Sequence, residues 1–192
     1  MSRRPDPDAA RALTRLGDAA CELGAVADLP ALCATVERAL GELVGFRLFT
    51  VLRATPARDG LERLHSSDPH AYPARGVKTV AGDAWLQRLL ADPHPALSPD
   101  ADAVRRNFPD AQAIFGLGCA SALNVPICFQ GRILGSMNLL HEAHWFRPGD
   151  AALCRPFAVL LGAAFAASGA SPSSSSSPCS TGPATQPAGV SP

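Results

Sequence analysis

The chain has 192 residues, a mass of 19.9 kDa and seventeen acidic against seventeen basic side chains, so its formal net charge at pH 7 is zero. This length predicts a single domain, and the neutral balance argues against a strongly basic nucleic-acid-binding protein. With 47% hydrophobic residues the chain has enough apolar side chains for a globular core. Its best apolar run, residues 157–167, has eleven residues, fewer than the roughly 20 of a transmembrane helix, so no membrane span is expected.

The two ends of the chain differ from the middle in composition. Two arginines near the amino terminus are followed by acids and prolines instead of an apolar stretch, so we expect no signal peptide and a cytoplasmic protein with reduced thiols. Residues 168–192 are dominated by Ser and Pro and are predicted to be a disordered tail. Residues 1–9 are predicted to be a flexible amino terminus, which leaves one domain over residues 10–167.

The first part of the chain predicts two amphipathic helices. The first, about residues 8–26, has five apolar residues at three- and four-residue spacing on one stripe: Leu13, Leu16, Ala20, Leu23 and Ala27. Asp28 is a predicted N-cap, Pro30 suits the first turn of the second helix, and Gly45 is a natural end.

Strand patterns follow. Residues 46–53 are rich in β-formers, and residues 61–67 are predicted to be the hairpin partner. Two clear strands come later, at residues 121–129 and 133–141, and a final helix begins at Pro148.

Between these two strand pairs lies a long section, roughly residues 68–118. It is predicted to be mostly loop, with short helices at residues 83–91 and 100–107. Ordered insertions of this length often serve as lids or binding segments. The element order predicts an α+β fold, with an antiparallel sheet and helices packed on one face.

Three segments resemble the GAF domain family of small-molecule-binding sensor domains. Residues 122–141 resemble the family's late hairpin, with a strand near a proline, a glycine turn and a Leu-Gly-x-x-Asn strand. Phe146-x-x-x-Asp150 and Asp28-Leu-Pro-Ala-Leu32 fit the family's last helix and entry helix. The resemblance covers residues 10–167 and implies about six antiparallel strands. It also implies terminal helices on one face and a ligand pocket on the other, under the long middle section.

The late hairpin is predicted to have one polar and one apolar face. A three-residue loop, Gln130-Gly131-Arg132, places Asn124 opposite Asn138 and Pro126 opposite Ser136. Asn124, Asn138, Ser136 and Cys128 then share a face that suits hydrogen bonding to a small polar ligand, or equally to the middle section. The apolar face, expected to pack on the terminal helices, comprises Leu123, Val125, Ile127, Phe129, Ile133 and Met137.

Aromatic side chains of the middle section are candidates for the lid of this pocket. Tyr72, Trp85, Phe108 and Phe115 either stack on a planar ligand or fill the core beneath the lid, and the apolar helical face around Trp85 favours the core. The predicted ligand-binding set is Asn124, Asn138, Ser136, Cys119, Tyr72, Trp85 and Phe108.

The ligand classes known in the family fit this sequence unequally. Cyclic-nucleotide-binding relatives carry Asn-Lys and Asp-Glu pairs, whereas Asn138 precedes Leu139 here and Asp150 precedes Ala151. No Cys-His dipeptide is present, which argues against a covalent bilin. The cofactor is therefore left unknown. The turn His141-Glu142-Ala143-His144 lacks the His-Glu-x-x-His spacing, so no metal site is predicted.

A cysteine-dependent reductase resembling free methionine-R-sulfoxide reductase is the enzymatic alternative, with Cys119 as nucleophile. Cys119 stands only seven residues before Pro126, closer than in that branch, and no cysteine lies between Cys33 and Cys119. A buried thiol that packs as an apolar group is the competing interpretation.

We therefore expect a sensory or regulatory GAF domain that binds an unidentified small molecule and has no output domain of its own. No catalytic residue is assigned unless Cys119 acts as a reductase nucleophile. Neither nucleic acid nor a membrane is expected as a partner. The stripe of the first helix offers a homodimer contact, or it packs on its own sheet.

Overall fold

The computed structural model describes residues 8–25, 28–73 and 76–169. Residues 1–7 of the predicted flexible amino terminus, Ala27 of the predicted stripe and residues 170–192 of the predicted tail lie outside the described residues.

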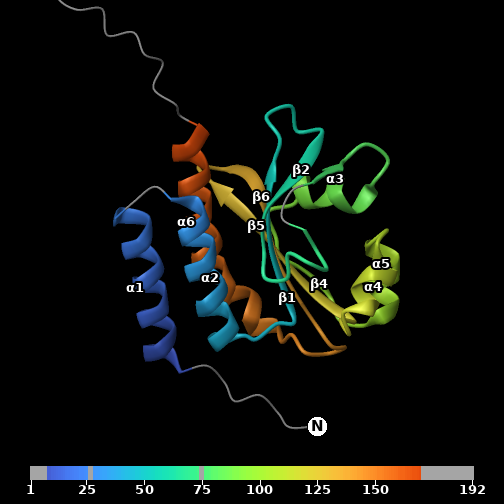
Figure 1. Cartoon of the computed structure of the whole chain (residues 1–192), viewed down its shortest axis with the longest axis horizontal. Helices are drawn as coiled ribbons and strands as arrows, with labels where there is room; N and C mark the ends of the chain where they lie inside the picture. Colours follow the sequence, from blue (N-terminus) through green and yellow to red (C-terminus); the bar gives the residue numbers. More distant parts are fainter. Residues whose placement is uncertain (1–7, 26–27, 74–75, 170–192) are drawn as a thin grey trace, which may run out of the picture.

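Six strands form one antiparallel sheet in the order β3-β2-β1-β6-β5-β4 (Figure 1). The sheet confirms the predicted α+β class. The strands are β1 (Leu48–Ala54), β2 (Gly60–Ser66), β3 (Val77–Thr79), β4 (Ala96–Ser98), β5 (Ser121–Phe129) and β6 (Arg132–His141). The two edge strands β3 and β4 arise from segments predicted as loop, and each has three residues.

Helices cover both faces of the sheet, in two different ways. Three long helices at the chain ends lie on one face: α1 (Ala9–Ala25), α2 (Leu29–Leu43) and α6 (Pro148–Gly169) (Figure 1). Three short helices of the middle section lie on the other: α3 (Ala84–Ala91), α4 (Ala101–Asn107) and α5 (Ala111–Gly116). We call residues 68–118, which contain these short helices, the lid.

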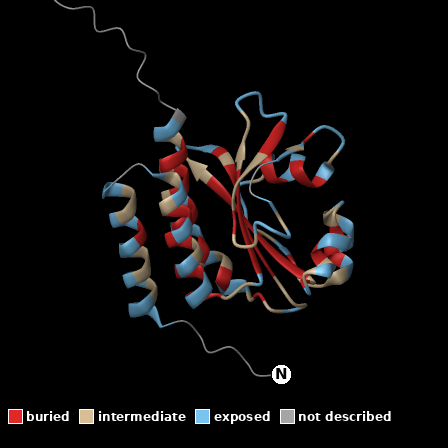
Figure 2. Ribbon diagram, viewed as in Figure 1, coloured by how far each residue is buried: buried red, intermediate tan, exposed pale blue. Residues whose placement is uncertain are grey.

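The core is therefore divided by the sheet, as the buried residues on both of its faces show (Figure 2). The main cluster lies between the sheet and the long helices and includes Phe49, Met137, Phe157 and Leu161. Two smaller clusters lie under the lid, one around α3 and one around α4 and α5. Strands β1, β5 and β6 are buried on both faces over most of their length, so side chains of both faces contribute to the core.

The inward face of α1 differs from the predicted stripe. Leu13 is 71% exposed and Ala20 is exposed as well, so neither belongs to the packed face. The residues that turn inward are Ala12, Leu16, Ala19 and Leu23. Their spacing of four, three and four residues follows the helical repeat, and Leu16 and Leu23 belong to the predicted stripe as well.

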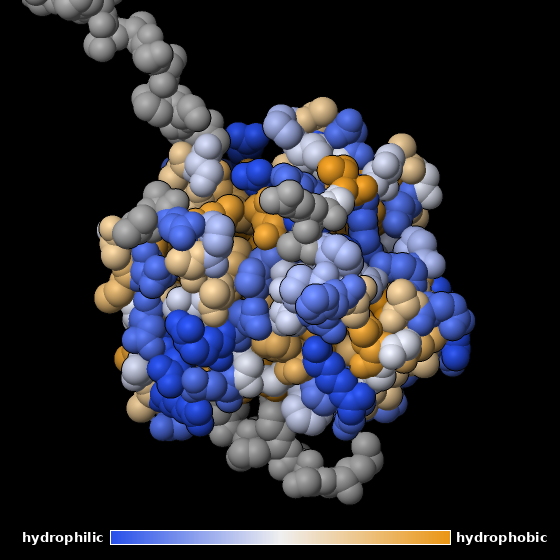
Figure 3. Space-filling view, viewed as in Figure 1, coloured by the Kyte–Doolittle hydropathy of each residue, from blue (hydrophilic) through white to orange (hydrophobic). Residues whose placement is uncertain are grey.

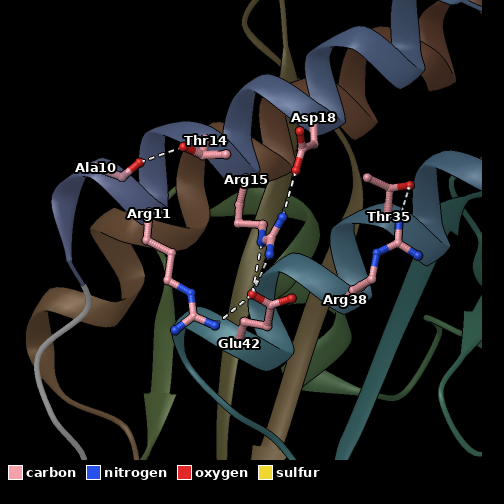
Figure 4. A network of polar contacts seen from close by, with 8 residues as sticks. All are labelled: Ala10, Arg11, Thr14, Arg15, Asp18, Thr35, Arg38 and Glu42. Atoms are coloured by element: carbon pink, nitrogen blue, oxygen red, sulfur yellow. Dashed lines mark hydrogen bonds and ion pairs between the residues drawn. The ribbon is translucent and has the colours of Figure 1, made fainter.

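Polar contacts tie α1 to α2 along one edge (Figure 4). Arg11 and Arg15 both donate to the Glu42 carboxylate of α2, at 2.8 and 2.9 Å. Arg15 also contacts Asp18 of its own helix at 3.0 Å. Helix α1 thus sits one layer away from the sheet and rests on the other two long helices.

The β5–β6 hairpin keeps the predicted register at its centre through a different turn. Asn124 lies opposite Asn138, and Pro126 opposite Ser136, as predicted. The loop has two residues instead of three, because Gln130 and Gly131 both adopt positive φ, at 49° and 74°.

A β-bulge restores the register that the shorter loop would have shifted. The shift lies between Ile127 and Cys128, so Cys128 pairs with Ile133. Ile133 therefore packs on the lid side with the α3 cluster, which corrects its predicted place on the apolar face toward the long helices. Leu134 contacts the main core in its stead.

Two glycines allow α6 and β1 to approach β6 and the hairpin closely. A Cβ on Gly135 would stand 2.1 Å from the Leu52 carbonyl oxygen and 3.0 Å from the Phe165 ring. A Cβ on Gly162 would stand 3.0 Å from the Cys128 carbonyl oxygen. Backbone is thus packed directly on backbone at this end of the sheet.

Helix α6 is the one described helix long and apolar enough to cross a membrane by length and composition, over Pro148–Ser168 with a mean hydropathy of 1.6. The prediction counted only an uninterrupted apolar run, whereas this helix includes Asp150 and Arg155. Here it lies along the sheet and buries Phe157, Leu161 and Phe165, as a core helix does.

Candidate functional site

A small cavity lies between the sheet and the lid. Its volume is about 40 Å³, room for about three water-sized groups. Strands β1, β5 and β6 form its floor through Leu48, Thr50, Leu52, Asn124, Asn138 and Leu140. The lid forms its roof, chiefly through Trp85, Leu86, Leu89, Phe108, Pro109 and Ile114.

The floor carries a chain of buried hydrogen bonds across three neighbouring strands. Asn138 accepts from Asn124 Nδ2 at 2.7 Å and from Ser136 Oγ at 2.6 Å. Asn138 Nδ2 donates to Thr50 Oγ1 of β1 at 3.1 Å. These bonds stay within the sheet, so they fix the orientation of the carboxamides without help from the lid.

Two buried polar atoms on opposite walls have no hydrogen-bond partner among the described residues. Asn124 Oδ1 is an acceptor on the floor, and Trp85 Nε1 is a donor on the roof. Leaving such a group unpaired costs about 1–3 kcal/mol each. Both atoms belong to residues that line the cavity, so a molecule bound there can satisfy both.

Local sequence explains how the roof residues are held. Asp83 caps α3 by accepting from Leu86 N at 3.0 Å, and Asp100 caps α4 by accepting from Ala103 N at 2.8 Å. The Trp85 ring lies 5.7 Å from Phe108, tilted by 54°. Trp85 is therefore at once a core residue and a lining residue, and the two predicted roles are compatible.

A charged cluster lies beside the cavity where β3 meets the turn before α5. Lys78 Nζ donates to Asp110 Oδ2 at 2.8 Å, and the Tyr72 hydroxyl donates to the same oxygen. The Arg63 guanidinium lies 4.6 Å above the Tyr72 ring. We call Tyr72, Lys78 and Asp110 the latch, because together they join three separate parts of the lid, one of which is β3.

Burial and hydrogen bonding set the charges of the latch. Burial by itself raises the pKa of Asp110, but Lys78 and the Tyr72 hydroxyl outweigh it and lower the pKa overall. Burial, together with the bond to Asp110, raises the pKa of Tyr72. At neutral pH the latch thus holds Asp110 as an ionised carboxylate and Tyr72 as a neutral phenol.

The predicted site residues fall into two groups. Asn124, Asn138, Tyr72, Trp85 and Phe108 all line the cavity. Ser136 does not line it and acts on it only through its bond to the Asn138 carboxamide.

Cys119 lies elsewhere, in the cluster around α4 and α5, and does not line the cavity. It is 1% exposed, and burial raises the pKa of its thiol to about 11. These surroundings are typical of a packing cysteine and differ from those of a nucleophile.

Sequence reasoning missed several lining or latch residues, namely Thr50, Arg63, Lys78 and Asp110. Thr50 had a signal, because it is a polar residue with two apolar residues on either side in its strand. The other three had none, since their segments were predicted as loop or as an outer strand.

The strand-end turn with two histidines forms a packed corner. The His141 and Trp145 rings stack at 3.7 Å and 10°. Trp145 Nε1 donates to the Val44 carbonyl at 3.1 Å, which ties this corner to the end of α2. Over the described ranges 8–25, 28–73 and 76–169, no group of three or more His, Cys, Asp or Glu side chains is arranged to hold a metal ion.

Comparison with known proteins points to one family. A family model described as GAF domain matches residues 28–165. No curated protein sequence matches the chain significantly.

Solved structures share the fold at low sequence identity. One is the GAF domain of a phosphoenolpyruvate-protein phosphotransferase from Coxiella burnetii, at 19% identity and TM-score 0.68, covering 85% of this chain and 97% of that one. Another is free methionine-R-sulfoxide reductase from Neisseria meningitidis with its substrate, at 19% identity and TM-score 0.65, covering 87% and 96%. A third is the chromophore-binding domain of a Stigmatella aurantiaca bacteriophytochrome, at 15% identity and TM-score 0.61, covering 81% and 60%.

Proposed function

Because the chain belongs to the GAF domain family, we propose that it reversibly binds a small polar molecule between sheet and lid and acts as a sensory or regulatory domain. One observation carries this proposal: Asn124 Oδ1 and Trp85 Nε1 are buried, unpartnered among the described residues, and on opposite walls of one cavity. The ligand accordingly has a hydrogen-bond donor for the carboxamide oxygen and an acceptor for the indole N–H.

The size of the cavity indicates how binding is transmitted. At about 40 Å³ it holds only a few atoms, so a larger ligand displaces the lid. The floor is braced by its own hydrogen bonds, whereas the roof consists of helices of six to eight residues. Movement therefore falls on the lid, and α3 carries it because Trp85, Leu86 and Leu89 are part of the roof.

The experiment uses Trp85 as an optical reporter. The chain has two tryptophans, so a Trp145→Phe variant leaves Trp85 as the only one. We expect native mass spectrometry of the purified full chain to show a retained small molecule. Titration of the Trp145→Phe variant with small amino acids, amides and nucleobases should give a saturable change in Trp85 emission for at least one class.

Asn124→Leu in the same background is the matched control, and it should weaken that binding about tenfold or more. A ligand that binds Asn124→Leu as tightly as the parent contradicts the assignment of the site. An apo mass together with flat titrations for every class contradicts binding itself.

The Cys119-centred reductase has less support. The Cys119 thiol would have to leave a buried cluster before it could react. Its pKa, which burial raises to about 11, would also have to fall. Turnover of free methionine sulfoxide by the full chain, lost in Cys119→Ser, would establish the reductase in place of the sensor.

Two further parts of the proposal concern compartment and association. The five described cysteines are free thiols, which suits the cytoplasm. A homodimer through the terminal helices would use exposed apolar side chains, and these helices offer Leu13 on α1 and Val159 on α6. The Val159 side chain is 51% exposed. Leu13→Glu with Val159→Glu should then give a monomer in sedimentation velocity.

A further inference from the structure

A second and larger cavity lies at the opposite end of the hairpin from the strand-end turn. It forms where the β1–β2 turn and the β5–β6 turn meet the last turns of α6, and its volume is about 600 Å³. Small-molecule sites usually measure about 300–1,000 Å³. We call this cavity the hairpin groove.

One wall of the hairpin groove is apolar and comes from distant parts of the chain. Phe129, Ile133 and Leu134 contribute from the hairpin, and Phe165 contributes from α6. In Figure 3, hydrophobic surface borders strongly hydrophilic surface near the end of α6. Such a wall suits the apolar body of a ligand.

The rim of the hairpin groove carries an excess of positive charge. Three arginines line it against one carboxylate, Glu62, which pairs with Arg53 at 3.0 Å. Arg58 donates to the carbonyl oxygens of Ile133 and Leu90, at 2.9 and 3.0 Å, so its position is fixed, and no described carboxylate forms an ion pair with it. Arg132 is exposed, and within the described part of the chain its side chain has no hydrogen-bond or ion-pair partner.

The apolar wall of the groove is closely packed where α6 meets the hairpin. At Gly162 the α6 backbone comes so close that an added Cβ would stand 3.2 Å from Phe129 Cβ. A preformed wall lowers the ordering cost of binding. Residues 170–192, which follow α6, contain no acidic side chain that could offer a carboxylate to the charged rim.

We propose that the hairpin groove binds an amphipathic anion of small-molecule size. Its apolar body packs against Phe129 and Phe165, and its carboxylate or other anionic head is bound by Arg58 and Arg132. This site is separate from the lid cavity: the two share no lining residue, and the groove lies at the end of the sheet beyond the Asn124–Asn138 floor.

The test uses 1-naphthoate as the probe and neutral 1-naphthamide as its uncharged analogue. In a ¹⁵N NMR titration of the full chain, we expect naphthoate to shift the amides of Gln130, Gly131 and Arg132 and to leave the Trp85 indole signal in place. Arg132→Gln should weaken naphthoate about tenfold and leave naphthamide unchanged. Arg106→Gln, the same change at an exposed position on α4, is the control and should leave both probes unchanged.

Naphthoate binding should also weaken as salt rises from 50 to 500 mM, a readout that needs no variant. Equal affinity for the two probes, unchanged binding by Arg132→Gln, or shifts confined to the lid residues would each overturn the proposal. So would the absence of any shift at millimolar naphthoate. Because lid and hairpin groove have different NMR reporters, failure at one site says nothing against the other.

Discussion

Two asparagines face each other across the hairpin, and the same substitution at each is expected to change the stability of the protein by very different amounts. Asn138 makes three buried side-chain hydrogen bonds, whereas Asn124 makes one and leaves its Oδ1 unpartnered among the described residues. Leucine is close in shape to asparagine but can neither donate nor accept a side-chain hydrogen bond. We therefore compare Asn138→Leu with Asn124→Leu in the ligand-free protein.

The hydrogen bonds give the size of the difference. Asn138→Leu removes three bonds at about 1 kcal/mol each and strands Asn124 Nδ2 in the core, so it should lower the free energy of unfolding by about 3–5 kcal/mol. Asn124→Leu loses one bond, worth about 1 kcal/mol. It also removes an unpaired acceptor that costs about 1–3 kcal/mol, so it should stay within about 1 kcal/mol of the parent or stabilise the protein.

Urea unfolding followed by far-UV circular dichroism measures both variants. With a slope of about 2 kcal/mol per molar urea, Asn138→Leu should lower the midpoint by about 2 M, and Asn124→Leu should leave it near the parent value. If Asn124→Leu destabilises as strongly as Asn138→Leu, then Oδ1 is already satisfied in the free protein. The argument for an acceptor awaiting a ligand then fails.

Three further perturbations test other parts of the structure. Burial raises the pKa of Cys119 to about 11, so at pH 8 only about one molecule in a thousand carries Cys119 as the thiolate. Peptide mapping after iodoacetamide treatment should find the exposed Cys21 modified before Cys119. Equal rates of modification at the two cysteines would contradict the burial of Cys119. Gly135→Ala forces a Cβ to 2.1 Å from a carbonyl oxygen and should cost about 3 kcal/mol or more in urea unfolding, whereas Gly149→Ala, with nothing within 4 Å, should cost little. Hydrogen bonds from Arg11 and Arg15 of α1 lower the pKa of Glu42. The ionised Glu42 therefore stabilises the folded protein above pH 4.5, and this stabilisation is lost as the pH falls through the lowered pKa. On going to pH 3 or to 1 M salt, hydrogen exchange of the α1 amides should therefore accelerate more than that of the α2 amides. Equal acceleration in both helices would argue against an attachment of α1 through these ion pairs.

The central part of the fold could be predicted because its elements are long and periodic. Strands β5 and β6 alternate around a glycine turn, and the long helices carry regular apolar spacing. The facing pair Asn124 and Asn138 was predicted correctly, although the turn was not. The two-residue loop and the bulge near Cys128 compensate each other, so the error is confined to the pairs next to the turn: Phe129 pairs with Arg132, where Ile133 was predicted, and Ile133 pairs with Cys128.

The lid could not be derived in the same way. Strands β3 and β4 have three residues each, which is too short for a period-two pattern, and they exist only because β2 and β5 offer pairing partners. The latch joins Tyr72, Lys78 and Asp110 across 38 residues of chain, a contact that no local spacing encodes. The hairpin groove was missed for the same reason, since its lining residues come from four separate segments.

The short edge strands have a consequence for aggregation. Strand β4 pairs with β5 only over Ala122, Leu123 and Asn124, so no other strand among the described residues lies beside the rest of β5 on that side. Pro126 stands just past this point and lacks the N–H that an incoming strand would require. At the other edge, β3 is equally short and carries Lys78. Both edges therefore resist strand addition from another molecule.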